Sequence, residues 1–173
     1  TLHYIPKTHF TIADAKRGDI GNTSAQYAKT FFETIPFDAV TVTPYMGEDS
    51  VRPFLEYTNK VTIVLGLTSN KGAEDFQHLH VVHPEPEEIL IPSIIQPNRH
   101  TTLFDEVITK TAQWGTANNL MFVVGATQAN LLEHIRTLVP NHFLLVPGVG
   151  FQGGSLQQVT QYGRNAEVGL LVN

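Results

Sequence analysis

Residues 10–20 read Phe10-Thr-Ile-Ala-Asp-Ala-Lys-Arg-Gly-Asp-Ile20. The stretch begins as an apolar strand, and because side chains alternate along a strand, Ile12, Asp14 and Lys16 share one face. A buried charge is costly unless it is paired and hydrogen-bonded, so an acid and a base in this strand need a chemical reason. Asp19 adds a second carboxylate just after the strand. This cluster predicts an α/β fold with Asp14, Lys16 and Asp19 as candidate catalytic residues at a strand end.

A simpler interpretation of the same stretch stays open. The pattern D-x-K-x-x-D also fits a surface ion pair at a strand-to-helix turn, with Asp19 or Asn22 as the N-cap of the following helix. The pattern by itself does not separate the two interpretations.

Composition restricts the class of protein. The 173 residues are 42% hydrophobic, which is enough for one core, and we expect a single domain over residues 1–173. No apolar run is long enough for a membrane span and no signal peptide is visible. The net charge of −5 argues against nucleic-acid binding. Cysteine is absent, which fits a reducing compartment, and we expect a cytoplasmic protein.

Apolar strand-like runs alternate with helix-like stretches along the chain. The predicted strands are Phe10–Ala15, Ala39–Thr43, Val61–Leu65, Leu120–Val124, Phe143–Val146 and Val168–Val172. The predicted helices are Thr23–Phe32, Asp49–Tyr57, Ala73–Leu79, Gln128–Leu138 and Ser155–Tyr162. This alternation indicates βαβ units and a parallel sheet, and the continuous apolar runs favour strands that are covered on both faces.

The count of six strands leaves the architecture open. A closed TIM (β/α)8 barrel needs eight strands and about 200 residues or more. Six strands also suit an open, doubly wound sheet.

Residues 80–101 interrupt the pattern with four prolines and several histidines, and we expect a Pro-rich surface excursion there. The pair His80 and His83 has the spacing of half a metal site. Without a third ligand at a set spacing this is a weak signal, and we expect no metal.

Four motifs, in order, resemble those of the orotidine 5′-phosphate decarboxylase family, in particular its longer bacterial form. They are Asp14-Ala-Lys-Arg-Gly-Asp-Ile-Gly-Asn-Thr23, Gly66-Leu-Thr-Ser-Asn-Lys-Gly-Ala-Glu-Asp-Phe76, Val123-Val-Gly-Ala-Thr-Gln128 and Val146-Pro-Gly-Val-Gly-Phe-Gln-Gly-Gly154. The resemblance runs from about residue 5 to residue 173. It implies that the chain covers strands three to eight of a TIM barrel.

The resemblance also implies a reaction, the decarboxylation of orotidine 5′-monophosphate to uridine 5′-monophosphate and CO2. The reaction has no electron sink for the carbanion at C6, and no cofactor motif is present in the sequence. We therefore expect catalysis without a cofactor, by electrostatic stabilisation, with Lys16 as the ammonium beside C6 and as the proton donor. Lysine suits this role because it is a compact charge that gives up a proton, unlike arginine. Asp14 and Asp19 would hold Lys16 in place.

Further roles follow from the resemblance alone. It implies a homodimer in which Asp19 and Thr23 act across the interface, with Ile20 at the same substrate-binding site. It implies that Ser69 bonds the pyrimidine edge. Pro147, Gln152 and Gly153 would contact substrate from a glycine-rich loop, whose backbone N–H groups suit phosphate binding. A further catalytic lysine is expected upstream of Thr1, and a phosphate-binding arginine after Asn173.

Two alternative functions stay open. One is a Mg²⁺-dependent sugar-phosphate decarboxylase or aldolase that shares the D-x-K-x-x-D strand. The other is a non-catalytic fragment that binds a phosphate ligand.

Overall fold

The computed structural model describes residues 2–82 and 100–173. Six parallel strands form one sheet in the order β1-β2-β3-β6-β7-β8, and two short strands form a separate antiparallel ribbon, β4-β5. The strands are β1 Ile12–Arg17, β2 Ala39–Val42, β3 Val61–Leu67, β4 His80–Val82, β5 His100–Thr102, β6 Leu120–Val124, β7 Leu144–Val146 and β8 Leu170–Val172. The expected parallel sheet is confirmed.

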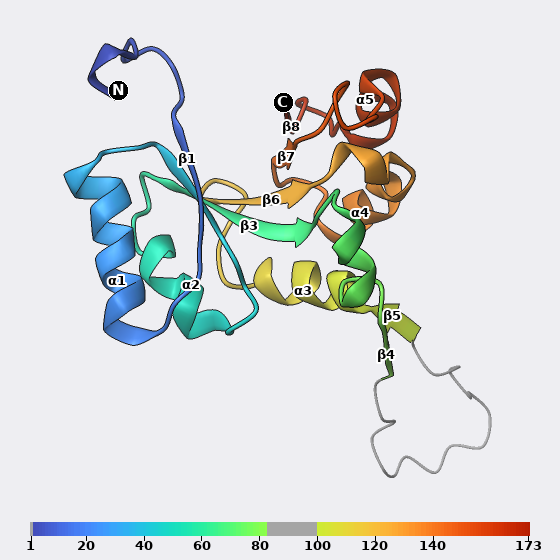
Figure 1. Ribbon diagram of the computed structural model, residues 1–173, viewed down its shortest axis with the longest axis horizontal. Coiled ribbons are helices and arrows are strands. Elements are labelled where there is room, and N and C mark those ends of the chain that lie inside the picture. The colour runs from blue at the N-terminus through green and yellow to red at the C-terminus, as the bar shows by residue number, and fades with distance from the viewer. Residues whose placement is uncertain (1, 83–99) are drawn as a thin grey trace.

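Helices follow the strands of the large sheet (Figure 1). They are α1 Gly21–Lys29, α2 Glu48–Leu55, α3 Leu103–Thr111, α4 Leu132–Leu138 and α5 Leu156–Gly163. Shorter helical segments are η1 Leu2–Tyr4, the π-helix η2 Thr30–Thr34, η3 Lys71–Asp75 and η4 Ala126–Leu131. α1 and α2 lie side by side, and α3 packs against β3 (Figure 1).

β6 shows how the sheet is covered. Leu120, Phe122 and Val124 pack in a large cluster with the helices, whereas Met121 and Val123 point to the opposite face. All five residues are buried, which confirms that the continuous apolar run marks a strand covered on both sides.

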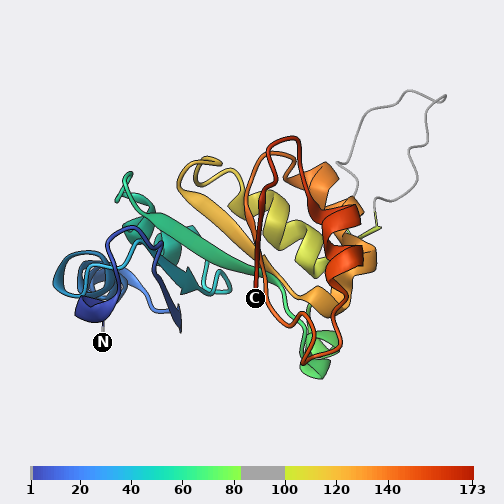
Figure 2. The same ribbon diagram turned by 90° about the horizontal axis from the view of Figure 1, so that it is seen from above.

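The face of the sheet away from the helices carries a second cluster that consists of strand residues alone. Its members are Ala39, Ile63, Met121, Val123 and Leu145, with Ile12, Val61, Leu65 and Leu171 packed against them. Strand order follows chain order without a reversal, and Figure 2 shows the sheet curving as it passes from β1 to β8. A doubly wound sheet would reverse its strand order and carry helices on both faces, so that alternative is wrong, and the sheet is part of a barrel wall.

Several element boundaries differ from those predicted. The predicted helix Ala73–Leu79 is the 3-10 helix η3, and the predicted helix Thr23–Phe32 begins earlier and ends in the π-helix η2. α3 was not expected at all. Its sequence signal is a capping box, in which Thr102 Oγ1 accepts from Asp105 N while the Asp105 carboxylate accepts from Thr102 N.

The Pro-rich excursion expected over residues 80–101 stays a prediction, because only the two ends of this segment are described. Its two ends are strands β4 and β5, which pair as an antiparallel ribbon that projects from the sheet and its helices (Figure 1). Residues 83–99, with His83 and the four prolines, lie outside the described residues.

Arg136 ties together the loops at the amino-terminal end of the last strands. Its guanidinium donates to the carbonyls of Gly163, Val139, His142 and Gly169, so that α4, α5 and the entries to β7 and β8 share one donor group. Burial lowers the pKa of Arg136 to about 10, so the side chain stays charged at neutral pH.

Replacing Arg136 should lower the stability of the fold. We expect Arg136→Met to lower the free energy of unfolding by about 3 kcal/mol, because four carbonyls lose a charged donor in a partly buried site. Urea unfolding measures the change. Arg164→Met is the matched control, since Arg164 is exposed, and it should change the free energy by less than about 0.5 kcal/mol. Equal losses in the two variants would contradict the structural role of Arg136.

Candidate functional site

A cavity of about 870 Å³ opens at the carboxyl ends of the parallel strands, on the face away from the helices. Among the described residues that line it, Asp14 and Lys16 of β1 carry the charged side chains. Ser69 lies on the loop after β3, and Pro147 and Gln152 lie on the loop after β7. Five of the residues predicted from the sequence therefore meet in one cavity.

Asp14 and Lys16 form an ion pair on this cavity. Lys16 Nζ donates to Asp14 Oδ1 at 2.6 Å. Both side chains are well exposed, Asp14 at 63% and Lys16 at 53%, and both line the open cavity. The hydrogen bond from Lys16 lowers the pKa of Asp14, a hydrogen bond from Thr41 adds to the effect, and partial burial opposes it. The carboxylate therefore stays ionised down to acidic pH.

The pair is presented by an irregular strand. Lys16 has a φ of 45°, which is unusual for a residue other than glycine, and the pairing of β1 with β2 shifts its register between Ala13 and Arg17. The expected face is correct, but a bulge, and not regular alternation alone, produces it.

Ser69 and Gln152 also meet, although they are 83 positions apart. Ser69 Oγ donates to Gln152 Oε1 at 2.7 Å across the mouth of the cavity. The pair adds one hydroxyl and one amide to the cavity that Asp14 and Lys16 also line. Polar groups that converge on a concave site are typical of ligand recognition.

The glycine-rich loop, residues 147–154, differs from expectation in its backbone. Its N–H groups were expected to be available for phosphate. Instead those of Gly148, Gly150, Gly153 and Gly154 donate to carbonyls, three of them within the loop and that of Gly148 to Asn173 O. Gly148, Gly150 and Gly153 have positive φ, which explains why glycine occupies these positions. Gln152 contributes its side chain to the cavity, whereas Gly153 does not line it.

Asp19, Ile20 and Thr23 are not brought to this cavity. The Asp19 carboxylate accepts from the backbone N–H of Ile20 at 2.8 Å, Ile20 is 57% exposed, and Thr23 lies exposed in the first turn of α1. The N-cap of α1 is Ile20 and has no side-chain cap, so the alternative in which Asp19 or Asn22 caps the helix is wrong.

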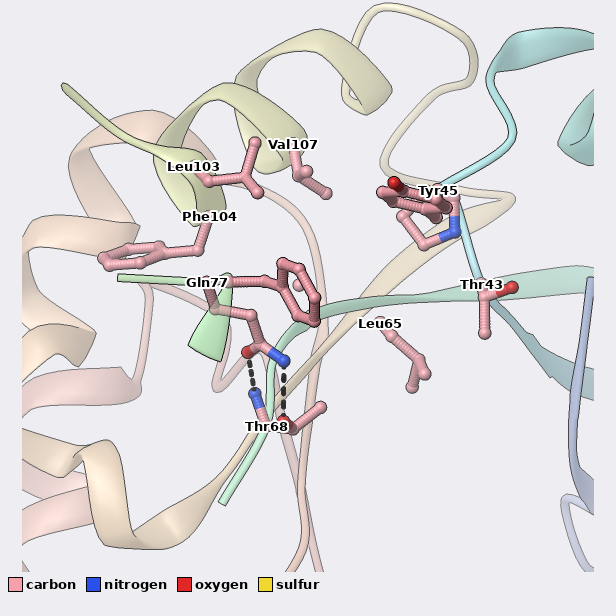
Figure 3. Close-up of a pocket in the computed structure, with 11 residues that line it drawn as sticks. Thr43, Tyr45, Leu65, Thr68, Gln77, Leu103, Phe104 and Val107 are labelled. Atoms are coloured by element: carbon pink, nitrogen blue, oxygen red, sulfur yellow. Dashed lines mark hydrogen bonds between the residues drawn. The ribbon is translucent and has the colours of Figure 1, made fainter. Parts of the chain in front are cut away.

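Figure 3 shows a second cavity, of about 390 Å³. Leu65, Thr68 and Gln77 line both cavities. The Gln77 amide bonds the backbone and hydroxyl of Thr68 and so holds the end of β3 (Figure 3). The residues that line this second cavity carry no charge, and we therefore assign the candidate site to the larger cavity.

Gly125 packs against the site residue Ser69, a role that the sequence did not reveal. A Cβ at this position would lie 2.6 Å from the backbone nitrogen and the Cβ of Ser69. The close approach of two strand ends, β3 and β6, requires glycine here and sets the place of Ser69.

The comparisons with known proteins agree with this geometry. The family profile described as "Orotidine 5′-phosphate decarboxylase / HUMPS family" matches residues 2–170. The chain belongs to this family.

Relatives within the family are similar over the whole chain. The chain is 52% identical to orotidine 5′-phosphate decarboxylase of Phocaeicola vulgatus and 55% identical to that of Christiangramia forsetii, and each alignment covers 100% of this chain. It spans 59% and 58% of the length of these two relatives. The solved structure of Leishmania donovani OMP decarboxylase matches 99% of this chain and 61% of its own, with 33% identity and a TM-score of 0.81. The expected family, and the TIM-barrel architecture of which this chain covers a part, are confirmed.

Two further observations concern the described residues, 2–82 and 100–173. No group of three or more histidine, cysteine or acidic side chains there is arranged to hold a metal ion. None of the helices in that part of the chain is long and apolar enough to cross a bilayer.

The packing of Gly125 against Ser69 predicts the effect of one added methyl group. Gly125→Ala should displace the Ser69 backbone, break the bond to Gln152, and lower the free energy of unfolding by about 1–3 kcal/mol through overpacking. A crystal structure and urea unfolding of the variant measure both effects. The control is Gly72→Ala, whose Cβ would meet only the ends of the Asn70 and Asp75 side chains. An unmoved Ser69 in Gly125→Ala would contradict the prediction.

Proposed function

We propose that the protein containing this chain decarboxylates orotidine 5′-monophosphate to uridine 5′-monophosphate and CO2, in pyrimidine biosynthesis. The observation that carries the proposal is the Lys16 ammonium, held by Asp14 at the carboxyl edge of a barrel sheet. Membership of the family and the names of relatives that are 52–55% identical support it.

The proposed chemistry is electrostatic. Loss of CO2 leaves a negative charge at C6 of the pyrimidine, and a fixed ammonium stabilises that charge more in the transition state than in the ground state. Lys16 then donates the proton that replaces CO2. Asp14 fixes the ammonium through the 2.6 Å hydrogen bond, which removes the need to reorient it during the reaction. The proposed chemistry needs no cofactor.

The remaining cavity residues would bind the nucleotide. In this proposal Ser69 and the Gln152 amide bond the pyrimidine edge, and Gln152 also reaches the phosphate from its loop. Pro147 and Gly153 shape that loop. The exposed Ser69–Gln152 hydrogen bond supports this assignment, because it brings the hydroxyl and the amide together at the cavity.

The proposed assembly is a homodimer in which Asp19, Ile20 and Thr23 reach the site of the neighbouring copy. Two observations support it: these residues do not line the cavity of their own chain, and Ile20 exposes a large apolar side chain. Tyr45, 87% exposed on the loop after the adjacent strand β2, adds apolar surface at the same end of the sheet.

The assignment of Lys16 predicts a large loss of activity. Lys16→Ala in the complete protein should lower kcat by at least about 10³-fold, because the charge and the proton donor are both removed. The measurement is the decrease of substrate absorbance, with circular dichroism as a check of the fold. Lys29→Ala, in which an exposed lysine of α1 is removed, is the control and should keep wild-type activity. Turnover of Lys16→Ala within about tenfold of wild type would sink the assignment.

The shared site predicts complementation between inactive subunits. A heterodimer of Lys16→Ala and Asp19→Ala subunits has one site in which both residues are intact. Random exchange makes half of the dimers mixed, so up to about a quarter of wild-type activity should return. Activity after verified subunit exchange is the measurement. If none returns, Asp19 does not act across the interface.

The two alternatives are not favoured by the relatives at 52–55% identity. They remain distinguishable by experiment, since a Mg²⁺-dependent enzyme would lose its activity in chelator and a non-catalytic protein would show none. The cytoplasmic location expected from the sequence stays a prediction.

A further inference from the structure

Thr41 lies opposite the irregular part of β1. β1 and β2 pair in register at Ala13 with Val40, and again at Arg17 with Val42. Between these pairs β1 has three residues, positions 14–16, whereas β2 has Thr41 alone. Two extra residues must therefore be accommodated across from one threonine, and the ordinary backbone ladder is interrupted there.

The Thr41 side chain replaces the missing ladder bonds. Its Oγ1 accepts from Lys16 N at 2.9 Å and donates to Asp14 Oδ1 at 3.0 Å. The carbonyl of Ala13, at 3.5 Å, is the more distant acceptor for the same proton. Thr41 is fully buried, with 0% exposure, so its hydroxyl depends on these protein partners and not on water.

These bonds act on both members of the ion pair. Asp14 Oδ1 accepts from Thr41 Oγ1 and from Lys16 Nζ, so the hydroxyl fixes the oxygen that holds the ammonium. The hydrogen bond from Lys16 N to Thr41 Oγ1 holds the backbone of Lys16. The φ of 45° at Lys16 is a conformation that a lysine adopts only when its surroundings impose it.

We propose that Thr41 is a positioning residue of the site: its buried hydroxyl holds the bulge of β1 that directs Asp14 and Lys16 into the cavity. The proposal rests on the proposed function in one respect, namely that the positioned ammonium is the catalytic one. Thr41 does not line the cavity, so it acts through Asp14 and Lys16.

The test compares two substitutions of Thr41 with a matched control. Thr41→Val keeps the shape and removes the hydroxyl, whereas Thr41→Ser keeps the hydroxyl. The control is Thr62→Val: Thr62 is also 0% exposed, on the neighbouring strand β3, but its hydroxyl has no hydrogen-bond partner among the described residues. Replacing it should therefore leave the site unchanged.

The first readout is independent of activity. Removing a hydrogen bond to the carboxylate favours the protonated acid, so Thr41→Val should raise the pKa of Asp14 by about 0.5–1 unit in a ¹³C NMR titration. The charged group that faces Asp14 from the described residues of the cavity is Lys16, which is present in every variant. Amide exchange at Lys16 should become at least about tenfold faster in Thr41→Val. Thr41→Ser and Thr62→Val should match wild type in both measurements.

The second readout is kinetic. Because the positioned ammonium acts on the transition state, Thr41→Val should lower kcat about 10–100-fold with a change in KM below about threefold, and Thr41→Ser should recover most of the loss. A protein without decarboxylase activity that still shows the NMR differences would refute the proposed function and leave the role of Thr41 intact.

Three results would overturn the proposal. The first is a Thr41→Val variant with the Asp14 titration and Lys16 exchange of wild type. The second is an equal effect of Thr62→Val. The third needs no variant and so applies even where Thr41→Val does not fold: an unprotected Lys16 amide in the wild-type protein would show that the hydrogen bond to Thr41 does not hold the bulge in solution.

Discussion

The hydrogen bonds of the Thr41 hydroxyl join the scaffold of this protein to its chemistry. β2 is buried along its whole length, and Thr41 is the place where this buried strand meets the bulge of β1. Since the bulge adds two residues to β1, the backbone of β2 alone does not satisfy it, and a side-chain hydroxyl takes over. Asp14 and Lys16 point into the cavity because the Thr41 hydroxyl makes the hydrogen bonds that the backbone of β2 does not make at the bulge.

The rest of the fold provides a rigid frame for this local irregularity. The helices bury one face of the sheet and the strands alone bury the other, so strands such as β6 are apolar on both sides. At the amino-terminal end Arg136 donates to four carbonyls, those of Val139 and His142 before β7, Gly163 at the end of α5 and Gly169 before β8. Stability is therefore concentrated away from the carboxyl edge, where loops carry the polar groups, which is the usual division in barrels.

The placement of Ser69 and Gln152 at the cavity depends on close packing of the backbone. Gly125 leaves no room for a side chain beside Ser69, and the loop after β7 closes on itself through its own hydrogen bonds, which brings Gln152 to Ser69. The glycines therefore allow the backbone geometry of the loop, and in this conformation their N–H groups are not free donors. The loop positions a side chain, and it is the amide of that side chain that faces the cavity.

The sequence by itself determined the parallel α/β architecture, because apolar runs and helix-like stretches alternate and each buried strand needs cover on both faces. It also predicted that Asp14 and Lys16 share a face, although not the bulge that places them there, and its motifs indicated the family. The tertiary structure was needed for the bulge, for Thr41, and for the meeting of Ser69 with Gln152. These contacts join residues 25 to 83 positions apart, and no local preference specifies them.

The capping box of α3 is the opposite case: the signal was local and present in Thr102 and Asp105, but the proline-rich segment before it obscured the start of a helix. Local chemistry therefore predicts elements and candidate groups, whereas strand register and loop closure, which depend on packing over long separations, determine which groups meet.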